Sequence, residues 1–154
     1  MRLAALKDPA TPLPDETVDK RRVIKLGGTV LELSYIGRNH SDSTLVMRLP
    51  KEKILFAVDF LPVGGVPGRG MIDFYPLEAE GSIKTVLKMD WERLIPGHPG
   101  PGDRLGTKRD VAAQLEFLQD ASEAVKVAAP GQVLGRGGKG SEAAEVRDLA
   151  GLRQ

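Results

Sequence analysis

Three residues of the sequence carry side chains that bind metals and stand where a loop follows a predicted strand. His40 lies in GRNHSDST, Asp59 follows the apolar run ILFAV, and His98 follows RLIPG. Functional residues gather at such places because the sheet fixes the backbone while the loop leaves the side chain free. Two imidazoles and a carboxylate are ligand types of zinc and iron sites that keep one position open for water. His40, Asp59 and His98 are therefore candidate metal ligands; the alternative is that each is an ordinary solvated or hydrogen-bonded loop residue.

The composition narrows the chemistry that the chain can perform. Its 154 residues contain no cysteine, which excludes disulfides, thiolate catalysis and cysteine-based zinc sites. Lys and Arg number 22 against 21 Asp and Glu, and the net charge of +1 gives no sign of nucleic acid or an anionic membrane as partner. We see no apolar run of the roughly 20 residues that a membrane span needs, and no signal-peptide pattern. We expect a cytoplasmic protein with one folded domain.

The hydrophobic pattern predicts the elements that must position the candidate ligands. In chain order they are strands at 22–26 and 29–35, strands at 44–49 and 54–58, a helix at 78–89, a strand at 93–95 and a helix from Thr107 to Pro130. Gly27 and Gly28 form the turn of the first hairpin. The strand at 54–58 is apolar enough for burial on both faces. Thr107 is expected to cap the last helix, whose apolar positions include Val111 and Val125.

The chain is predicted to have three parts. Residues 1–16 are rich in proline and are expected to form an extended arm. Residues 17–130 hold the predicted strands and helices, arranged as a sheet with its helices on one side. Within them, the segment 61–73 is rich in Gly and Pro, and a connection of this length is often functional or mobile. Residues 131–154 are expected to form a flexible linker and a short terminal helix.

Two further acids lie close to the candidate ligands in the sequence or in the long loop. Asp42 follows His40 by two residues, so its carboxylate could orient the imidazole through a hydrogen bond; the alternative is an Asx turn. Asp73 could contact a ligand or substrate, and its alternative is a solvated loop acid. A Ser-His-Asp nucleophile built on Ser41 or Ser43 has no support, because no second histidine lies nearby in sequence.

Three separate segments resemble the metallo-β-lactamase superfamily. GRNHSDSTLVMRLPKEKILFAVDFL is similar to the family's Gly-x-x-His-Ser/Thr loop, hairpin and LF-x-x-D strand end, and DWERLIPGHPG is similar to its PGH turn. The resemblance implies that His40 is the family's middle ligand, Asp59 the carboxylate that bridges two metals, and His98 the final ligand. It implies a zinc-dependent hydrolase with one or two ions, manganese and iron being alternatives, that acts on a small molecule through metal-activated water.

The family's His-x-His-x-Asp-His signature is absent, because no histidine precedes His40. Each metal would then keep two protein ligands from this chain, where a catalytic zinc normally has about three. Val58 and Pro99 also stand where the family commonly has glycine. We therefore expect a truncated or split chain: either a hydrolase whose site another chain completes, inactive in isolation, or a non-catalytic half-domain that keeps the scaffold with weak or no metal binding.

The family fold is an αββα sandwich of two halves, and residues 17–130 resemble its carboxy-terminal half. The resemblance implies an α+β fold with a mixed, mainly antiparallel sheet and helices on one face. The other sheet face would be apolar and exposed, which soluble monomers rarely tolerate over a large area. We expect this face to be covered in a homodimer around a two-fold axis or by a complementary amino-terminal half.

Overall fold

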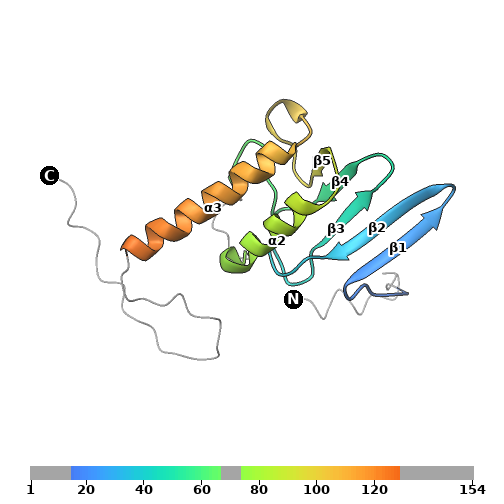
Figure 1. Ribbon diagram of the computed structural model, residues 1–154, viewed down its shortest axis with the longest axis horizontal. Helices are drawn as coiled ribbons and strands as arrows, with labels where there is room; N and C mark the ends of the chain where they lie inside the picture. Colours follow the sequence, from blue (N-terminus) through green and yellow to red (C-terminus); the bar gives the residue numbers. More distant parts are fainter. Residues whose placement is uncertain (1–14, 67–73, 129–154) are drawn as a thin grey trace, which may run out of the picture.

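The computed structural model describes residues 15–66 and 74–128, which form one sheet with two long helices (Figure 1). The elements follow the order β1 (Arg21–Leu26), β2 (Thr29–Tyr35), β3 (Leu45–Leu49), β4 (Ile54–Ala57), α2 (Pro76–Lys88), β5 (Arg93–Pro96), the short 3-10 helix η2 (Pro101–Asp103) and α3 (Lys108–Ala128). Each predicted strand and helix within these residues is confirmed, with bounds that shift by a few residues.

The strands lie in the sheet in the order in which they occur in the chain. The first four pair antiparallel, and β5 pairs parallel to β4 after the α2 crossover. The first hairpin turns at Gly27 and Gly28, whose φ angles of 57° and 80° are those that glycine adopts without steric cost. Because β4 and β5 are parallel, their carboxyl ends lie at the same edge of the sheet. The loops that carry Asp59 and His98 therefore start side by side.

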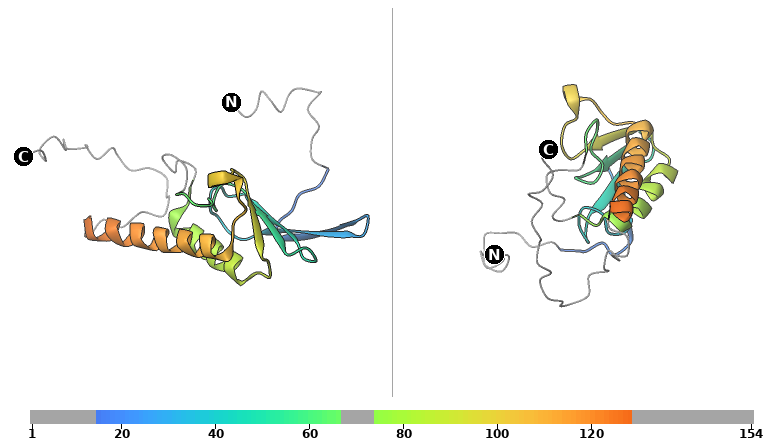
Figure 2. Two further views of the ribbon diagram at one scale, coloured as in Figure 1. Left: turned by 90° about the horizontal axis from the view of Figure 1, so that it is seen from above. Right: turned by 90° about the vertical axis from the view of Figure 1, so that its left-hand side faces the viewer.

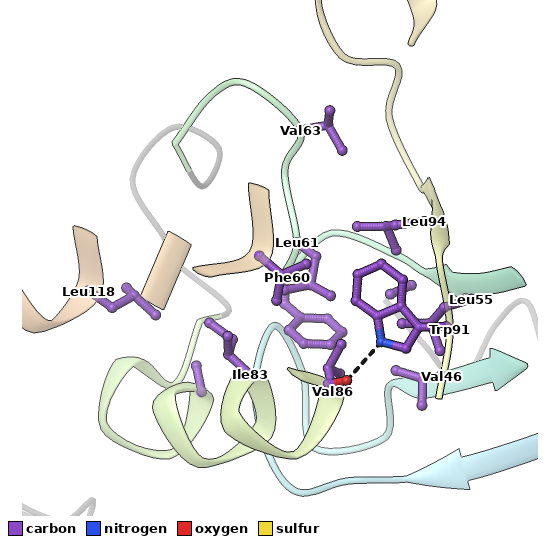
Figure 3. Packing of buried hydrophobic residues seen from close by; sticks show 13 residues of the cluster. Val46, Leu55, Phe60, Leu61, Val63, Ile83, Val86, Trp91, Leu94 and Leu118 are labelled. Atoms are coloured by element: carbon purple, nitrogen blue, oxygen red, sulfur yellow. Dashed lines mark hydrogen bonds between the residues drawn. The ribbon is translucent and has the colours of Figure 1, made fainter. Parts of the chain in front are cut away.

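Both long helices lie on one face of the sheet (Figures 1 and 2), which confirms the predicted α+β half-sandwich. The core between helices and sheet includes Leu55, Ile83, Leu94 and the side chain of Trp91, all at most 2% exposed (Figure 3). The indole Nε1 of Trp91 donates to the carbonyl of Val86 at 2.8 Å, so the one polar atom of this large side chain is satisfied inside the core. Trp91 thus fastens the end of α2 to the sheet.

The face away from the helices, called the open sheet face below, has no described helix or strand over it and is mainly apolar. Four side chains oppose one another in one row across this face, namely Leu33, Met47, Phe56 and Ile95. Strand β4 shows the difference between the faces: Leu55 and Ala57 are fully buried under the helices, whereas Phe56 is only half-buried. The prediction that this strand is buried on both faces is therefore wrong, because within the described residues only one face has a layer of helices over it.

Helix α3 begins at a reciprocal cap. The side chain of Asp110 accepts hydrogen bonds from the backbone N–H of Thr107 at 2.8 Å and from its hydroxyl at 2.7 Å. Arg104 adds two bonds to the same carboxylate, at 2.6 and 3.0 Å. The Thr107 hydroxyl oxygen in turn accepts the backbone N–H of Asp110 at 3.4 Å, which completes a capping box and confirms the predicted role of Thr107. Val125, one of the apolar positions of the predicted helix, is 45% exposed, because the carboxy-terminal part of α3 extends beyond the sheet (Figure 2).

Replacement of Asp110 by asparagine is expected to destabilise the fold by about 1 to 2 kcal/mol at pH 7. The Arg104 guanidinium, followed by the Thr107 hydroxyl and backbone, holds the pKa of Asp110 well below its ordinary value. A carboxyl with a lowered folded-state pKa contributes stability above its unfolded pKa and loses it as the pH falls towards the folded pKa. Urea unfolding should therefore show the wild type losing more stability than Asp110→Asn from about pH 5 downward. Parallel curves for the two proteins would contradict this account.

Two predicted segments fall largely or wholly outside the described residues: the arm over 1–16, of which only Asp15 and Glu16 are described, and the segment 131–154. None of the helices within 15–66 and 74–128 combines the length and apolar character needed to cross a membrane.

Candidate metal centre

The three predicted ligands meet at the edge of the sheet where β4 and β5 end. His40 Nε2 lies 3.9 Å from Asp59 Oδ2, and His98 Nε2 lies 2.7 Å from Asp59 Oδ1. Each imidazole therefore faces a different oxygen of one carboxylate. The side chain of Asp59 is 28% exposed, that of His40 38% and that of His98 84%, so the cluster is open to solvent on the His98 side.

Asp59 has a strained backbone. Its φ angle is 68°, in the left-handed region that few residues other than glycine adopt, and Phe60 N–H donates to the Val58 carbonyl at 2.9 Å across it. A bond between residues two apart around a positive φ is a rare and strained turn. The next residues, Phe60 and Leu61, are at most 2% exposed, so their packing in the core holds this turn in place. Such strain persists where surrounding packing imposes it, often at functional sites.

One carboxylate oxygen of Asp59 has no hydrogen-bond partner among the described residues. Oδ1 is buried, and its 2.7 Å contact with His98 Nε2 does not have hydrogen-bond geometry. A buried oxygen without a hydrogen bond is costly, and a bound cation is one group that would satisfy such an atom. Ligand atoms on one tetrahedral zinc lie about 3.3 Å apart, and the two imidazole–carboxylate separations fall on either side of this value.

The described residues contain no group of three His, Asp or Glu side chains that could hold one metal ion. This result agrees with the geometry of the cluster, because His40 and His98 face opposite oxygens of Asp59 and do not converge on one point. The residues present therefore fit two ligand pairs that share Asp59. They do not fit a complete three-ligand site.

Asn39 holds the backbone of His40 in place. Asn39 is fully buried, its Oδ1 accepts the backbone N–H of His40 at 2.6 Å, and its Nδ2 donates to the Gly37 carbonyl at 3.1 Å. Its own carbonyl accepts the N–H of Tyr75 at 2.7 Å, so the loop is tied to the start of α2. Sequence reasoning missed this residue. An amide directly before a candidate ligand was the available signal, but a polar loop residue gives no indication that it is buried.

Helix α2 anchors the same loop from a second point. The hydroxyl of Ser82, which is 1% exposed, lies within hydrogen-bond distance of the carbonyls of Ile36 and Arg38, at 3.1 and 3.2 Å. Gly37 has a φ of 106°, and a Cβ there would lie 3.2 Å from the Ser82 hydroxyl. The His40 loop is thus bonded to the start of α2 through Tyr75 and to its middle through Ser82.

His98 is brought to Asp59 by a close approach of the two strand ends. Gly97 N–H donates to the Ala57 carbonyl at 3.2 Å. A Cβ on Gly97 would lie 2.9 Å from the Cα of Val58 and 2.6 Å from its Cγ1, which leaves room for glycine only. The glycine in the PGH segment therefore positions the histidine that follows it.

No contact of the two other acids with this cluster is observed among the described residues. Asp42 is exposed, and its carboxylate has no hydrogen bond to a described residue, so its proposed contact with His40 stays a prediction. Asp73 lies outside the described residues.

The sequence matches no protein-family model and no curated protein. Comparison of the structure gives clear neighbours. A metallo-β-lactamase from Pontibacter korlensis matches with a TM-score of 0.59 at 22% identity, over 77% of this chain and 54% of its own. TMB-1 matches with a TM-score of 0.61 at 20% identity over the same shares. FIM-1 from Pseudomonas aeruginosa, solved in a mono-zinc form, matches with 0.53 at 17% identity, over 60% of this chain and 40% of its own.

These neighbours are metallo-β-lactamases, so the chain has part of the metallo-β-lactamase fold, as the sequence resemblance implied. The chain spans about half the length of the first solved structures that it matches. At these identities, the comparison supports the fold and not the activity.

Proposed function

We propose that this chain supplies one half of the metal centre of a zinc-dependent hydrolase with the metallo-β-lactamase fold. The observation that carries the proposal is the carboxylate of Asp59, which turns one oxygen towards His40 and the other, buried and without a hydrogen bond, towards His98. Backbone strain at Asp59 supports the same reading, because a residue that served only the fold would gain nothing from this conformation.

Each residue of the cluster has a distinct task in this proposal. His40, Asp59 and His98 would hold one or two zinc ions, and the negative charge of Asp59 would offset part of the positive charge. A bound zinc ion would supply a water molecule acidic enough to act as a nucleophile near neutral pH. Asn39 orients His40 through its backbone, and Gly97 allows His98 to approach.

The remaining ligands must come from outside these three residues. The sequence has only two histidines, and the described residues hold no third ligand in reach of either pair. We propose that a complementary half-domain supplies them and covers the open sheet face at Met47 and Phe56. This chain covers about half the length of the solved structures that it matches, which supports a complementary half-domain as the partner. A second copy of this chain is the less suitable partner, because it would bring only the same three ligands again.

A non-catalytic half-domain is the second candidate function. Its supporting observation is that no three ligands of the described residues converge on one point. In this case the cluster is a remnant that keeps the scaffold and binds metal weakly or not at all.

Size-exclusion chromatography with light scattering, followed by metal analysis of the same peak, distinguishes these possibilities. Protein purified with zinc and without chelator is expected to elute as a metal-containing monomer, and His40→Ala is expected to lose the metal. If the wild-type protein contained no metal, the non-catalytic half-domain would be the function that remains. If the wild type were a dimer and Phe56→Glu a monomer, a second copy of this chain would be the partner that covers the open sheet face. Phe117→Glu, at an exposed position of α3, is the matched control.

A further inference from the structure

A cavity of about 330 Å³ adjoins the candidate metal centre, between the loop after β4 and the loop after β5. Asp59 and His98 stand at one side of it, and the other walls include Leu61, Val63, Val66 and Pro101. Its volume is at the lower end of the range for small-molecule sites, about 300 to 1,000 Å³, and its mostly apolar walls with a few polar groups are typical of such sites.

The walls of the cavity are held by close packing of the two loops. A Cβ on Gly100 would lie 2.7 Å from the carbonyl oxygen of Val63, and one on Gly106 would lie 2.8 Å from its Cγ2. A Cβ on Gly64 would lie 3.0 Å from Pro101. Approaches as close as these are possible only with glycine, and they pack the two loops against each other beside the cavity. A preformed cavity binds its ligand without an ordering cost.

The chemistry of the walls determines what the cavity can bind. Asp59 and His98 are the two residues with ionisable side chains among the described lining residues, and neither Lys nor Arg is among them. Among the described lining residues a carboxylate or phosphate group would find no Lys or Arg, and it would lie near the carboxylate of Asp59. The guanidinium of Arg104 lies close to Gly64 but is bonded to the carboxylate of Asp110. The hydrocarbon surface of the lining comes instead mainly from Val66, which is 61% exposed, and from the proline rings of Pro96 and Pro99, which are not fully buried.

We infer that this cavity binds a neutral apolar group of the substrate, such as a short alkyl or acyl chain, beside Asp59 and His98. That this group belongs to a substrate rests on the proposed hydrolase function, whereas the binding of an apolar group rests on the cavity alone. Burial of a methylene group in such a site is expected to strengthen binding by about fourfold.

Binding of simple amides to the metal-free chain tests this inference. The probes are ethanamide, butanamide and hexanamide, and hexanoate is the anionic counterpart. Their binding is measured by the backbone ¹H–¹⁵N shifts of Gly64, Gly65 and Gly97, which line the cavity. Affinity is expected to rise by about fourfold for each added methylene, and hexanoate is expected to bind at least about tenfold more weakly than hexanamide. Equal binding of ethanamide and hexanamide, or shifts confined to the open sheet face at Met47 and Phe56, would overturn the inference.

A pair of valine substitutions provides the control. Val66→Asp places a charge on the cavity wall at an exposed position that tolerates a polar residue, and it is expected to weaken hexanamide binding at least about tenfold. Val127→Asp makes the same change on exposed α3 and should leave binding unchanged. Equal effects of the two variants would also contradict the inference. Because no metal is added and no turnover is measured, failure here is distinct from failure of the proposed metal centre.

Discussion

Replacement of Asp59 by glycine is expected to weaken zinc binding by at least about 100-fold while making the fold more stable. The substitution removes the carboxylate that both imidazoles face. It also relieves the strain of a non-glycine residue at a φ of 68°, and it eliminates a buried oxygen that has no hydrogen bond. These two features cost about 1 to 3 kcal/mol each. The entropy that glycine brings to the unfolded chain offsets about 1 kcal/mol of the gain.

The net expectation is a rise of about 1 kcal/mol or more in the free energy of unfolding, measured by urea denaturation of the metal-free proteins. Asp59→Ala is the matched variant. It lacks the carboxylate but keeps a Cβ at the strained position, so it should be less stable than Asp59→Gly and equally poor in zinc binding. A glycine variant that is less stable than the wild type, or that keeps its zinc affinity, would show that Asp59 serves the fold and not a metal.

Replacement of Gly97 by alanine is expected to cost about 2 to 3 kcal/mol of stability and to weaken zinc binding. The new Cβ would lie 2.9 Å from the Cα of Val58, and a backbone atom cannot rotate away. The end of β5 must then move, which stretches the Gly97 hydrogen bond to Ala57 and carries His98 away from Asp59. Urea unfolding and a zinc competition titration with a chromophoric chelator measure the two effects.

Gly81→Ala is the control for the glycine substitution. Gly81 lies in α2 with nothing within 4 Å of an added Cβ, so alanine should stabilise the helix by about 0.5 to 1 kcal/mol and leave zinc binding unchanged. If Gly97→Ala were as stable as the wild type, the close approach of the two strand ends would not be what positions His98.

The meeting of the three candidate ligands could be predicted because it follows from local signals. Apolar residues mark the strands, and the resemblance of three short segments to a known family placed His40, Asp59 and His98 in one site; the parallel pairing of β4 and β5 is seen only in the structure. Asp59 and His98 each follow the end of one of these strands, and the capping pair at Thr107 fixes the start of α3. Patterns of this kind depend on residues a few positions apart, so one sequence is enough to read them.

Other features depend on packing between distant segments, and the sequence does not reveal them. The burial of Asn39 results from its contact with Tyr75 at the start of α2, and the left-handed backbone of Asp59 results from the anchoring of Phe60 in the core. The burial of β4 was overestimated because an apolar run looks the same whether one face or both are covered. Val125 has helical spacing but lies beyond the sheet that would bury it.

The most direct test of the central claim is a zinc titration followed by the imidazole ¹⁵N signals of His40 and His98. The chain has two histidines, so both sets of signals can be assigned by a single substitution. If these residues and Asp59 form half of a metal centre, zinc should shift the Nε2 signals of both histidines together, and Asp59→Gly should abolish both shifts. Nε2 signals that do not respond to zinc, or that respond equally in the Asp59→Gly variant, would contradict the claim.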